Sequence, residues 1–340
     1  MADADRYDRQ RRLDVFGADG QRRLAEGRAL IVGCGALGSS LASLLARAGV
    51  GHLRIVDRDL LETSNLHRQV LYGEQDVADG TPKAVAAARR LHAINSEVSI
   101  DEQVADVDAR NIGSLIEGVD LVLDGTDNFE TRYLINDACV ERGLPWVYGG
   151  VVGTIGMTLT VIPGEGPCLR CVFPEPPPPG SLPTCDTVGV LNTAPALVAA
   201  LQATEAIKLW IDPGAVDRKL RHVDLWDGSI RALTIERSPD CPACVDHRYD
   251  FLAERASSWT TTLCGRNAVQ ITPPADAPAA DLQRLRSRLE AVGSVRDNGL
   301  LIQADVDDHS LLLFPDGRVI VEGTTDPALA RSLVARYVGS

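Results

Sequence analysis

The chain has 340 residues, of which 45% are hydrophobic, and this predicts one large or two moderate globular domains. Its formal net charge of -13, from 47 acidic and 34 basic side chains, disfavours general attraction to nucleic-acid phosphates or to an anionic membrane. The charged residues 1–10 and the lack of any run of 18 apolar residues disfavour secretion and a membrane span, so we expect a cytoplasmic protein.

Strand and helix patterns alternate over the first half of the chain. Short apolar runs predict buried parallel strands, and longer periodic or capped segments predict helices. In chain order we expect a helix at 5–23, a strand at 29–32, a helix at 36–48, a strand at 53–56, a helix at 82–94 with Thr81 as its N-cap, a strand at 98–104, a helix at 109–116, a strand at 120–123, a helix at 129–142 and a strand at 146–148. This alternation predicts an α/β fold with a doubly wound, mostly parallel, Rossmann-like sheet.

The pattern changes after the strand at 146–148. Residues 157–162 alternate between apolar and polar types, which predicts antiparallel strands added at one side of the sheet. The proline-rich stretch 174–190 can be neither a helix nor a central strand, so it predicts an exposed crossing loop. Residues 194–211 are apolar on nearly every face, as expected of a buried helix.

A second pattern begins near residue 255. We therefore divide the chain into a first domain at 1–254 and a small α+β domain at 255–340 that serves docking or stability. Its expected elements are a strand at 269–271, a helix at 281–292, strands at 300–304, 310–314 and 318–321, and a helix at 326–337. Pro315-Asp316-Gly317 predicts a hairpin turn before the last of these strands.

A glycine-rich turn, Gly33-x-Gly35-x-x-Gly38, links the first strand to the following helix. In such a turn the first glycine permits the bend, the second lets backbone amides approach a phosphate, and the third lets the helix pack on its strand. Asp57 ends the next strand, where a carboxylate can bind ribose hydroxyls. Taken alone, this pattern also fits a nicotinamide, a flavin or another nucleotide.

The residues after the ribose carboxylate favour a triphosphate. Arg68 and Lys83 can neutralise phosphate oxygens, and Asn65 and Gln69 can orient them by hydrogen bonds. Asp127 directly follows the fourth strand, at the sheet edge where ligands bind, and can hold Mg²⁺. Individually, Arg68 and Lys83 also fit solvated surface charges, and Asp127 also fits a helix cap. Together these residues favour ATP over a hydride-transfer cofactor.

Four of the eight cysteines form two CxxC pairs, Cys168 with Cys171 and Cys241 with Cys244. Four thiolates are the ligand set of a closed structural zinc site. The pairs are about 70 residues apart, so the metal would join two distant segments of one domain. Redox-active pairs and incidental free thiols are the alternatives. No open coordination position is expected, so the zinc has no catalytic role.

The motifs occur in an order that resembles one family. They are Tyr7-Asp8-Arg9-Gln10, the glycine turn, Asp57-x-Asp59, Ser64 to Gln69, Pro82-Lys83 and Thr126-Asp127-Asn128. Over roughly residues 5–250 the chain resembles the HesA/MoeB/ThiF family, the bacterial relatives of ubiquitin-activating enzymes. The resemblance implies an adenylyltransferase that uses ATP and Mg²⁺ to adenylate the C-terminal glycine of a ubiquitin-like sulfur carrier. That carrier would be ThiS-like or MoaD-like and would serve thiamine or molybdenum-cofactor biosynthesis.

The resemblance also implies roles for individual residues. Those of the nucleotide site are Gly33, Gly35, Gly38, Asp57, Asp59, Asn65, Arg68, Gln69, Lys83, Asp127 and Asn128. Arg68, Lys83 and Asp127 would act in catalysis, and Arg9 would reach into the partner's ATP site in a homodimer. Cys185, next to the proline-rich stretch, would take part in persulfide or thioester-like transfer, with an idle exposed thiol as the alternative. A sulfurtransferase or a cysteine desulfurase is a candidate further partner.

Two other classes of function stay open on the sequence. The first is a related enzyme that uses ATP to activate another carboxylate or a tRNA base, although the acidic charge disfavours the tRNA version. The second is a nucleotide-binding interaction subunit or a nicotinamide-dependent oxidoreductase. Arg68, Lys83 and Asp127 are present, which disfavours an inactive subunit, and a hydride-transfer constellation is missing.

Overall fold

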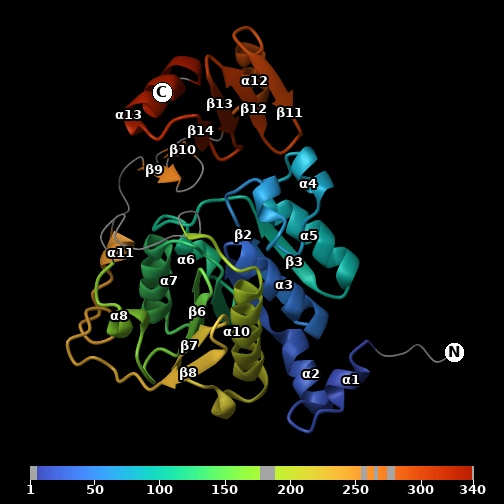
Figure 1. Ribbon diagram of the computed structural model, residues 1–340, viewed down its shortest axis with the longest axis vertical. Coiled ribbons are helices and arrows are strands. Elements are labelled where there is room, and N and C mark those ends of the chain that lie inside the picture. Colours follow the sequence, from blue (N-terminus) through green and yellow to red (C-terminus); the bar gives the residue numbers. More distant parts are fainter. Residues whose placement is uncertain (1–5, 177–187, 254–258, 264–266, 274–279, 339–340) are drawn as a thin grey trace, which may run out of the picture. The chain divides into compact units, whose positions relative to one another are not determined.

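The structure is a computed structural model that describes residues 6–176, 188–253, 259–263, 267–273 and 280–338. By their contacts the residues form two compact units. The first unit comprises Met1–Ala78 and Pro82–Ala253, and the second comprises Asp79–Thr81 and Glu254–Ser340. Each unit has its own sheet and its own hydrophobic core (Figure 1).

Within the described residues, the first unit holds an eight-stranded sheet. The strand order is β3 (Ser99–Gln103), β2 (His52–Val56), β1 (Arg28–Val32), β4 (Leu121–Asp124), β5 (Trp146–Val152), β6 (Ile155–Val161), β7 (Leu220–Asp224) and β8 (Ser229–Leu233). The strands from β3 to β5 in this order are parallel, and β6, β7 and β8 add antiparallel pairings. The prediction of a doubly wound, mostly parallel sheet with added antiparallel strands is confirmed.

Helices cover both faces of this sheet (Figure 1). Those of the first unit are α1 (Asp8–Arg11), α2 (Gly17–Glu26), α3 (Ala36–Ala48), α4 (Glu74–Ala78), α5 (Lys83–Ile94), α6 (Ile112–Leu115), α7 (Phe129–Arg142), α8 (Leu169–Val172), α10 (Thr193–Ile211) and α11 (Asp250–Ala253), with 3₁₀ turns at Thr63–Asn65 and Pro213–Ala215. The predicted buried helix is α10, which packs on α3, β5 and β6. Among the described helices, none combines the length and the apolar character needed to cross a membrane.

The strand β1 shows why the sheet is covered on both sides. Ala29 and Ile31 enter the core formed with α3, α5 and α10, whereas Leu30 and Val32 enter the core formed with α6 and α7. Successive side chains of a strand point to opposite faces, so a strand buried on both faces is apolar at every position. This explains why the run at 29–32 has no polar alternation.

The register of the central strands brings three chain segments to one edge. Val32 pairs with Val56 on one side and with Asp124 on the other. Because β1, β2 and β4 are parallel, the residues that follow them leave the sheet side by side. The glycine turn, Asp57 and the residues after Asp124 therefore meet at the carboxyl edge.

The second unit is an antiparallel sheet with two helices, as predicted for a small α+β fold. Within the described residues its strand order is β11 (Ser294–Asp297), β12 (Ile302–Val306), β13 (His309–Leu313), β14 (Val319–Glu322), β10 (Ala268–Thr272) and β9 (Trp259–Leu263), with helices α12 (Leu282–Leu289) and α13 (Pro327–Tyr337). Its core includes Val269, Leu311 and Leu333. Arg318 is buried with its guanidinium over the Phe314 ring, 4.1 Å from the centroid.

Several predicted elements have different bounds in the structure. The helix predicted at 5–23 is two helices, α1 and α2, and α2 begins at Gly17, which has a φ of +61°. The helix predicted to follow a Thr81 cap begins at Lys83, with Pro82 in the cap position. The hairpin of β7 and β8 was not predicted, because β8 is exposed along most of its length and lacks the alternation of a half-buried strand.

Candidate active site

The glycine turn between β1 and α3 is packed against the turn after β4. Gly33 has a φ of +84°, and a Cβ atom there would lie 2.8 Å from the carbonyl oxygen of Gly125. A Cβ atom on Gly38 would lie 1.9 Å from the carbonyl oxygen of Gly33, so the close approach of α3 to β1 requires glycine. A Cβ atom on Gly35 would meet only the Gln69 Nε2 atom, at 3.8 Å, among the atoms within 4 Å. The protein thus leaves space at the N-terminus of α3.

These environments predict opposite effects for two alanine substitutions. Gly38→Ala is expected to cost about 3 kcal/mol or more of unfolding free energy, because no rotamer change relieves a clash with the backbone. Gly35→Ala is expected to keep the fold and to lose nucleotide affinity, since its Cβ would enter the space where a phosphate approaches. Chemical denaturation and nucleotide-induced thermal shifts would measure both. Wild-type nucleotide affinity in Gly35→Ala would contradict this interpretation of the turn.

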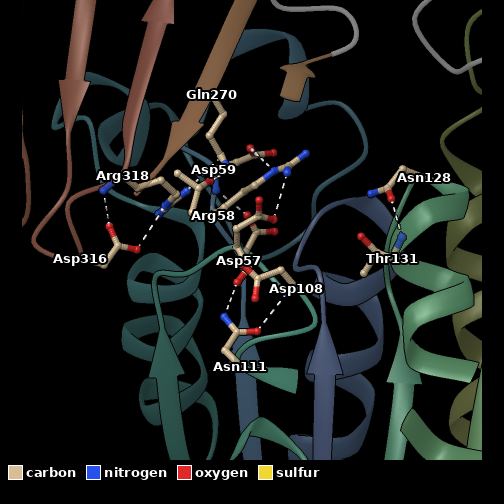
Figure 2. A network of polar contacts seen from close by, with 12 residues as sticks. Asp57, Arg58, Asp59, Asp108, Asn111, Asn128, Thr131, Gln270, Asp316 and Arg318 are labelled. Carbon is tan, nitrogen blue, oxygen red and sulfur yellow. Dashed lines mark hydrogen bonds and ion pairs between the residues drawn. The ribbon is translucent and has the colours of Figure 1, made fainter. Parts of the chain in front are cut away.

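Asp57, labelled in Figure 2, follows β2. It braces the glycine turn. Its Oδ2 atom accepts a hydrogen bond from the Cys34 backbone N–H at 2.6 Å, and its Oδ1 atom accepts one from the Asp59 backbone N–H at 2.7 Å. Burial raises the pKa of the Asp57 carboxyl, and the neighbouring Lys83 ammonium opposes the shift. Each carboxylate oxygen can accept a second donor, which fits the predicted contact with ribose hydroxyls.

Lys83 is held at the same edge by Asp59. Its Nζ atom lies 2.8 Å from the Asp59 Oδ2 atom, and its side chain is only 7% exposed. The Lys83 backbone N–H also donates to the Asp59 carbonyl oxygen at 2.9 Å. The ammonium is close enough to the glycine turn to oppose the burial that raises the pKa of the Cys34 thiol to about 12. A buried cation beside this turn fits a role in phosphate binding.

The segment from Ser64 to Gln69 is ordered by its own hydrogen bonds. The Asn65 Oδ1 atom accepts from the Glu62 backbone N–H at 3.2 Å, and the Arg68 Nη1 atom donates to the Ser64 carbonyl oxygen at 2.8 Å. Gln69 is 3% exposed, and its Oε1 atom has no hydrogen-bond partner among the described residues. A buried amide with an unsatisfied oxygen beside Gly35 is more typical of a binding site than of a packed core.

The turn after β4 carries two polar residues with different roles: one caps a helix, and the other makes no hydrogen bond to the described residues. Asn128 is the N-cap of α7, since its Oδ1 atom accepts from the Thr131 backbone N–H at 2.9 Å (Figure 2). The preceding residue, Asp127, is exposed and makes no hydrogen bond within the described part of the chain. The cap of α7 is therefore Asn128 and not Asp127, which leaves the Asp127 oxygens available to a cation.

Sequence reasoning missed two arginines at this edge. Arg58 lies 2.9 Å from Asp106, and Arg132 lies 3.1 Å from the buried Asp124. Burial raises the pKa of the Asp124 carboxyl, which Arg132 opposes. Arg58 lies just after β2, Arg132 lies on α7, and neither belongs to a phosphate-binding motif. Their contacts are therefore visible only once the order of the strands is known. A charged residue at the end of an apolar strand, such as Asp124, was the one available signal.

The four cysteines of the two CxxC pairs come together in the first unit. Their Sγ atoms all lie within 4.8 Å of one another, with 3.5 Å between Cys168 and Cys241 and 3.5 Å between Cys171 and Cys244. Four thiolates around a zinc ion, with Zn–S bonds of about 2.3 Å, are about 3.8 Å apart. Both the ligand type and the spacing fit a tetrahedral metal such as zinc.

A buried ion pair joins α8, which carries residues of the first CxxC pair, to α7. Arg170, between the first two cysteines, lies 3.5 Å from Asp137 and 3.1 Å from Asp250. The Asp137 Oδ2 atom also accepts from the Phe251 backbone N–H at 3.2 Å. Next to it, the Asn136 side chain accepts from the Leu169 backbone N–H at 2.9 Å. The residues around both CxxC pairs are therefore anchored to one helix.

Asp137 predicts a specific pH dependence of stability. Burial raises the pKa of its carboxyl to about 6, against the effect of Arg170, whereas an unfolded chain has a value of about 3.9. The folded state binds the proton more tightly, so this contribution to stability is present below about pH 4 and is lost as the pH rises through about 6. Relative to Asp137→Asn, the wild type should lose about 3 kcal/mol of unfolding free energy as the pH rises from about 4 to about 6. Urea unfolding of both proteins at equal zinc content measures this loss. A difference in unfolding free energy between wild type and Asp137→Asn that does not change with pH would contradict the prediction.

The comparisons with known proteins agree with this architecture. The model of the ThiF family matches residues 7–243. The chain belongs to the ThiF family. It is 43% identical over 338 residues to the sulfur carrier protein ThiS adenylyltransferase of Bacillus subtilis, a match that covers 98% of this chain and 99% of that protein.

Two further matches cover smaller shares of the chain. The SAMP-activating enzyme E1 of Haloferax volcanii is 43% identical over 251 residues, which cover 74% of this chain and 92% of that protein. Among solved structures, E. coli MccB with ATP superposes with a TM-score of 0.61 and 26% identity. That match covers 71% of this chain and 75% of MccB.

In this ThiF-family chain, Arg9 lies at the end of α3 that is remote from the glycine turn. The Gln10 Nε2 atom donates to the Ala48 carbonyl oxygen at 2.8 Å, and the Tyr7 ring packs against Gly49, where a Cβ atom would lie 2.5 Å from it. The 13 residues of α3 span roughly 20 Å. The exposed Arg9 is therefore not brought to the glycine turn of its own chain.

Cys185 lies outside the described residues, so its predicted role in transfer has no structural test. Cys34 and Cys139 are fully buried, and burial raises the pKa of both thiols. Neither of these two thiols is placed for nucleophilic chemistry.

Proposed function

We propose that this chain uses ATP and Mg²⁺ to adenylate the C-terminal glycine carboxylate of a ubiquitin-like sulfur-carrier protein. The observation that carries the proposal is that the glycine turn, Asp57 and the Asp127 turn follow neighbouring parallel strands at one edge of the sheet, where Asp59 holds Lys83. Relatives named adenylyltransferases of sulfur carriers match 98% and 71% of this chain, which supports the proposal. Edges of this kind are where doubly wound sheets bind nucleotides.

The reaction suits the groups at this edge. An oxygen of the carrier's terminal carboxylate attacks the α-phosphorus of ATP, and the bond from that phosphorus to the oxygen bridging to the β-phosphate breaks. Pyrophosphate leaves, and the adenylyl group is then bonded to the carrier's terminal carboxylate. The attacking carboxylate is already ionised, so no general base is required. Lys83, Arg68 and backbone amides at Gly35 would hold the phosphates in line and offset their charge.

Asp127 would hold the magnesium ion together with phosphate oxygens and water. Its exposed carboxylate is free of hydrogen bonds to the described residues, as a ligand of a hard cation requires. The metal would supply charge neutralisation on the triphosphate. Asp57 would bind the ribose, and Asp59 would hold the Lys83 ammonium next to the phosphates.

The second unit favours a ThiS-like carrier and a role in thiamine biosynthesis. The Bacillus subtilis relative named for ThiS matches both units of this chain. By contrast, the sulfur carrier protein adenylyltransferase of Thermus thermophilus matches 71% of this chain and 91% of its own length. A MoaD-like carrier is the alternative that direct assay would distinguish.

Further features belong to the same proposal. In a homodimer, Arg9 would enter the partner's ATP site, which agrees with its distance from the glycine turn of its own chain. Cys185 would receive the activated carrier in a later transfer step, with a sulfurtransferase or a cysteine desulfurase as sulfur source. The four-cysteine cluster would hold structural zinc. The protein would work in the cytoplasm.

The direct test is to incubate the purified protein with ATP, Mg²⁺ and ThiS-like or MoaD-like carriers. We expect a carrier mass increased by one adenylyl group on the terminal glycine, together with carrier-dependent exchange of pyrophosphate into ATP. A carrier with a C-terminal amide is the matched control, since it lacks the attacking oxygen. Equal exchange with and without carrier, or no adenylate on any carrier, would contradict the proposal.

A further inference from the structure

Asp124 and Arg132 form a buried ion pair beside the turn that carries Asp127. Asp124, at the end of β4, is fully buried, and the Arg132 side chain on α7 is 7% exposed. The guanidinium lies over the Phe129 and Tyr148 rings, 5.3 and 5.5 Å from their centroids. Burying two charges is unfavourable unless further hydrogen bonds satisfy both groups.

Those further hydrogen bonds hold the turn. The Asp124 Oδ1 atom accepts from the backbone N–H of Thr126 at 2.9 Å and from its hydroxyl at 2.7 Å. The Arg132 Nη2 atom donates to the carbonyl oxygens of Thr126 at 2.7 Å and of Gly149 at 3.1 Å. The Gly149 N–H completes the set by donating to the Asp124 Oδ2 atom at 3.3 Å. The pair therefore fixes Thr126 through both its N–H and its C=O.

Asp127 is consequently held from both sides while its carboxylate makes no hydrogen bond to the described residues. Thr126 before it is fixed by the ion pair, and Asn128 after it caps α7. Magnesium requires near-octahedral geometry from its ligands, so a ligand on a fixed backbone binds it better than one on a mobile turn.

We propose that Arg132, acting through Asp124 and Thr126, positions Asp127 for the magnesium ion of the adenylation reaction. The inference rests on the function proposed above. Arg132 is a positioning residue, because its own contacts are to the protein. Groups that support metal ligands in this way change metal affinity or activity by roughly 10–100-fold when they are replaced.

The test is the Arg132→Lys variant, which keeps the charge but loses the planar fork that reaches an acid and two carbonyls at once. Two measurements apply: the thermal shift by ATP with Mg²⁺ over ATP without added Mg²⁺, and the Mg²⁺ concentration for half-maximal pyrophosphate exchange. We expect the magnesium-specific thermal shift to fall and the half-maximal Mg²⁺ concentration to rise roughly 10–100-fold. The thermal shift by ATP without added Mg²⁺ should remain as in wild type.

Arg170→Lys is the matched control. Arg170 also forms a buried pair with a carboxylate on α7, Asp137, but its other ion-pair partner among the described residues is Asp250, and it makes no contact with the Asp127 turn. We expect a lower thermal midpoint and an unchanged dependence on Mg²⁺. If both lysine variants lower the midpoint and neither changes the magnesium dependence, Arg132 is only structural and the inference is wrong.

Thr126→Val serves if Arg132→Lys does not fold. It removes one hydroxyl hydrogen bond to Asp124 and keeps the side-chain shape, so a severalfold rise in the half-maximal Mg²⁺ concentration is expected. A wild-type magnesium dependence in this variant would overturn the inference. If the wild-type protein itself shows neither exchange nor a magnesium-specific thermal shift, the proposed function fails instead.

Discussion

Replacing Asp127 by asparagine is expected to lower carrier-dependent exchange of pyrophosphate into ATP by roughly 10²–10³-fold or more. The substitution keeps the size of the side chain and removes the negative charge that would bind magnesium. Stability should change little, because Asp127 is exposed and makes no hydrogen bond to the described residues. Initial rates at saturating carrier and ATP, with thermal midpoints alongside, measure both effects.

Glu130→Gln provides the control for Asp127→Asn. Glu130 is an exposed carboxylate in the first turn of α7, three residues further along, and its replacement removes the same charge from the same region. We expect near wild-type exchange in this variant. Wild-type exchange in Asp127→Asn would exclude Asp127 as the metal ligand. Lys83→Ala should also abolish exchange, but it removes the cation that lies 2.8 Å from Asp59 and therefore tests stability and chemistry together.

Removing one ligand of the cysteine cluster is expected to lower the thermal midpoint by roughly 10 °C or more. Cys241→Ser is the sharpest variant, because Cys241 is 1% exposed and is far along the chain from Cys168, its neighbour in space. A serine hydroxyl is a poor zinc ligand, so three thiolates would remain around an incomplete site. The bound zinc and the midpoint should fall together, and a strong chelator should reproduce the loss in wild type.

Cys139→Ala controls for the loss of a buried thiol. Cys139 is as buried as Cys241 but lies on α7 and outside the cluster. Its replacement should leave the zinc content unchanged and cost only about 1 kcal/mol of packing. Full zinc occupancy and a wild-type midpoint in Cys241→Ser would contradict a structural metal.

The sequence predicted the sheet and its nucleotide-type edge because both depend on local signals. The apolar run at 29–32 and the glycines at Gly33 and Gly38 identify a strand and a turn without knowledge of the rest of the chain. Likewise, the two CxxC pairs predict that their four cysteines lie close together, because one zinc ion takes four thiolate ligands. The contacts of the nucleotide-site residues with ATP stay predictions.

The parts that sequence analysis missed depend on contacts between distant segments. Arg132 is one of several arginines in helices, and nothing local shows that it faces Asp124 and the Gly149 carbonyl. Arg170 lies within a CxxC pair, and nothing local shows that it contacts Asp137. The edge strand β8 is exposed along most of its length, so its short segment buries little apolar surface and carries only a weak hydrophobic signal.

The cysteine cluster also closes a long loop in the chain. Cys168 and Cys241 are 73 positions apart, and α10 and the β7–β8 hairpin lie between them. A cross-link over such a span removes roughly 4–5 kcal/mol of conformational entropy from the unfolded chain. During synthesis, at about 5–20 residues per second, the loop stays open for several seconds after Cys171 has emerged from the ribosome. The supply of metal ions at that stage would then determine how soon the antiparallel strands β7 and β8 are held in place.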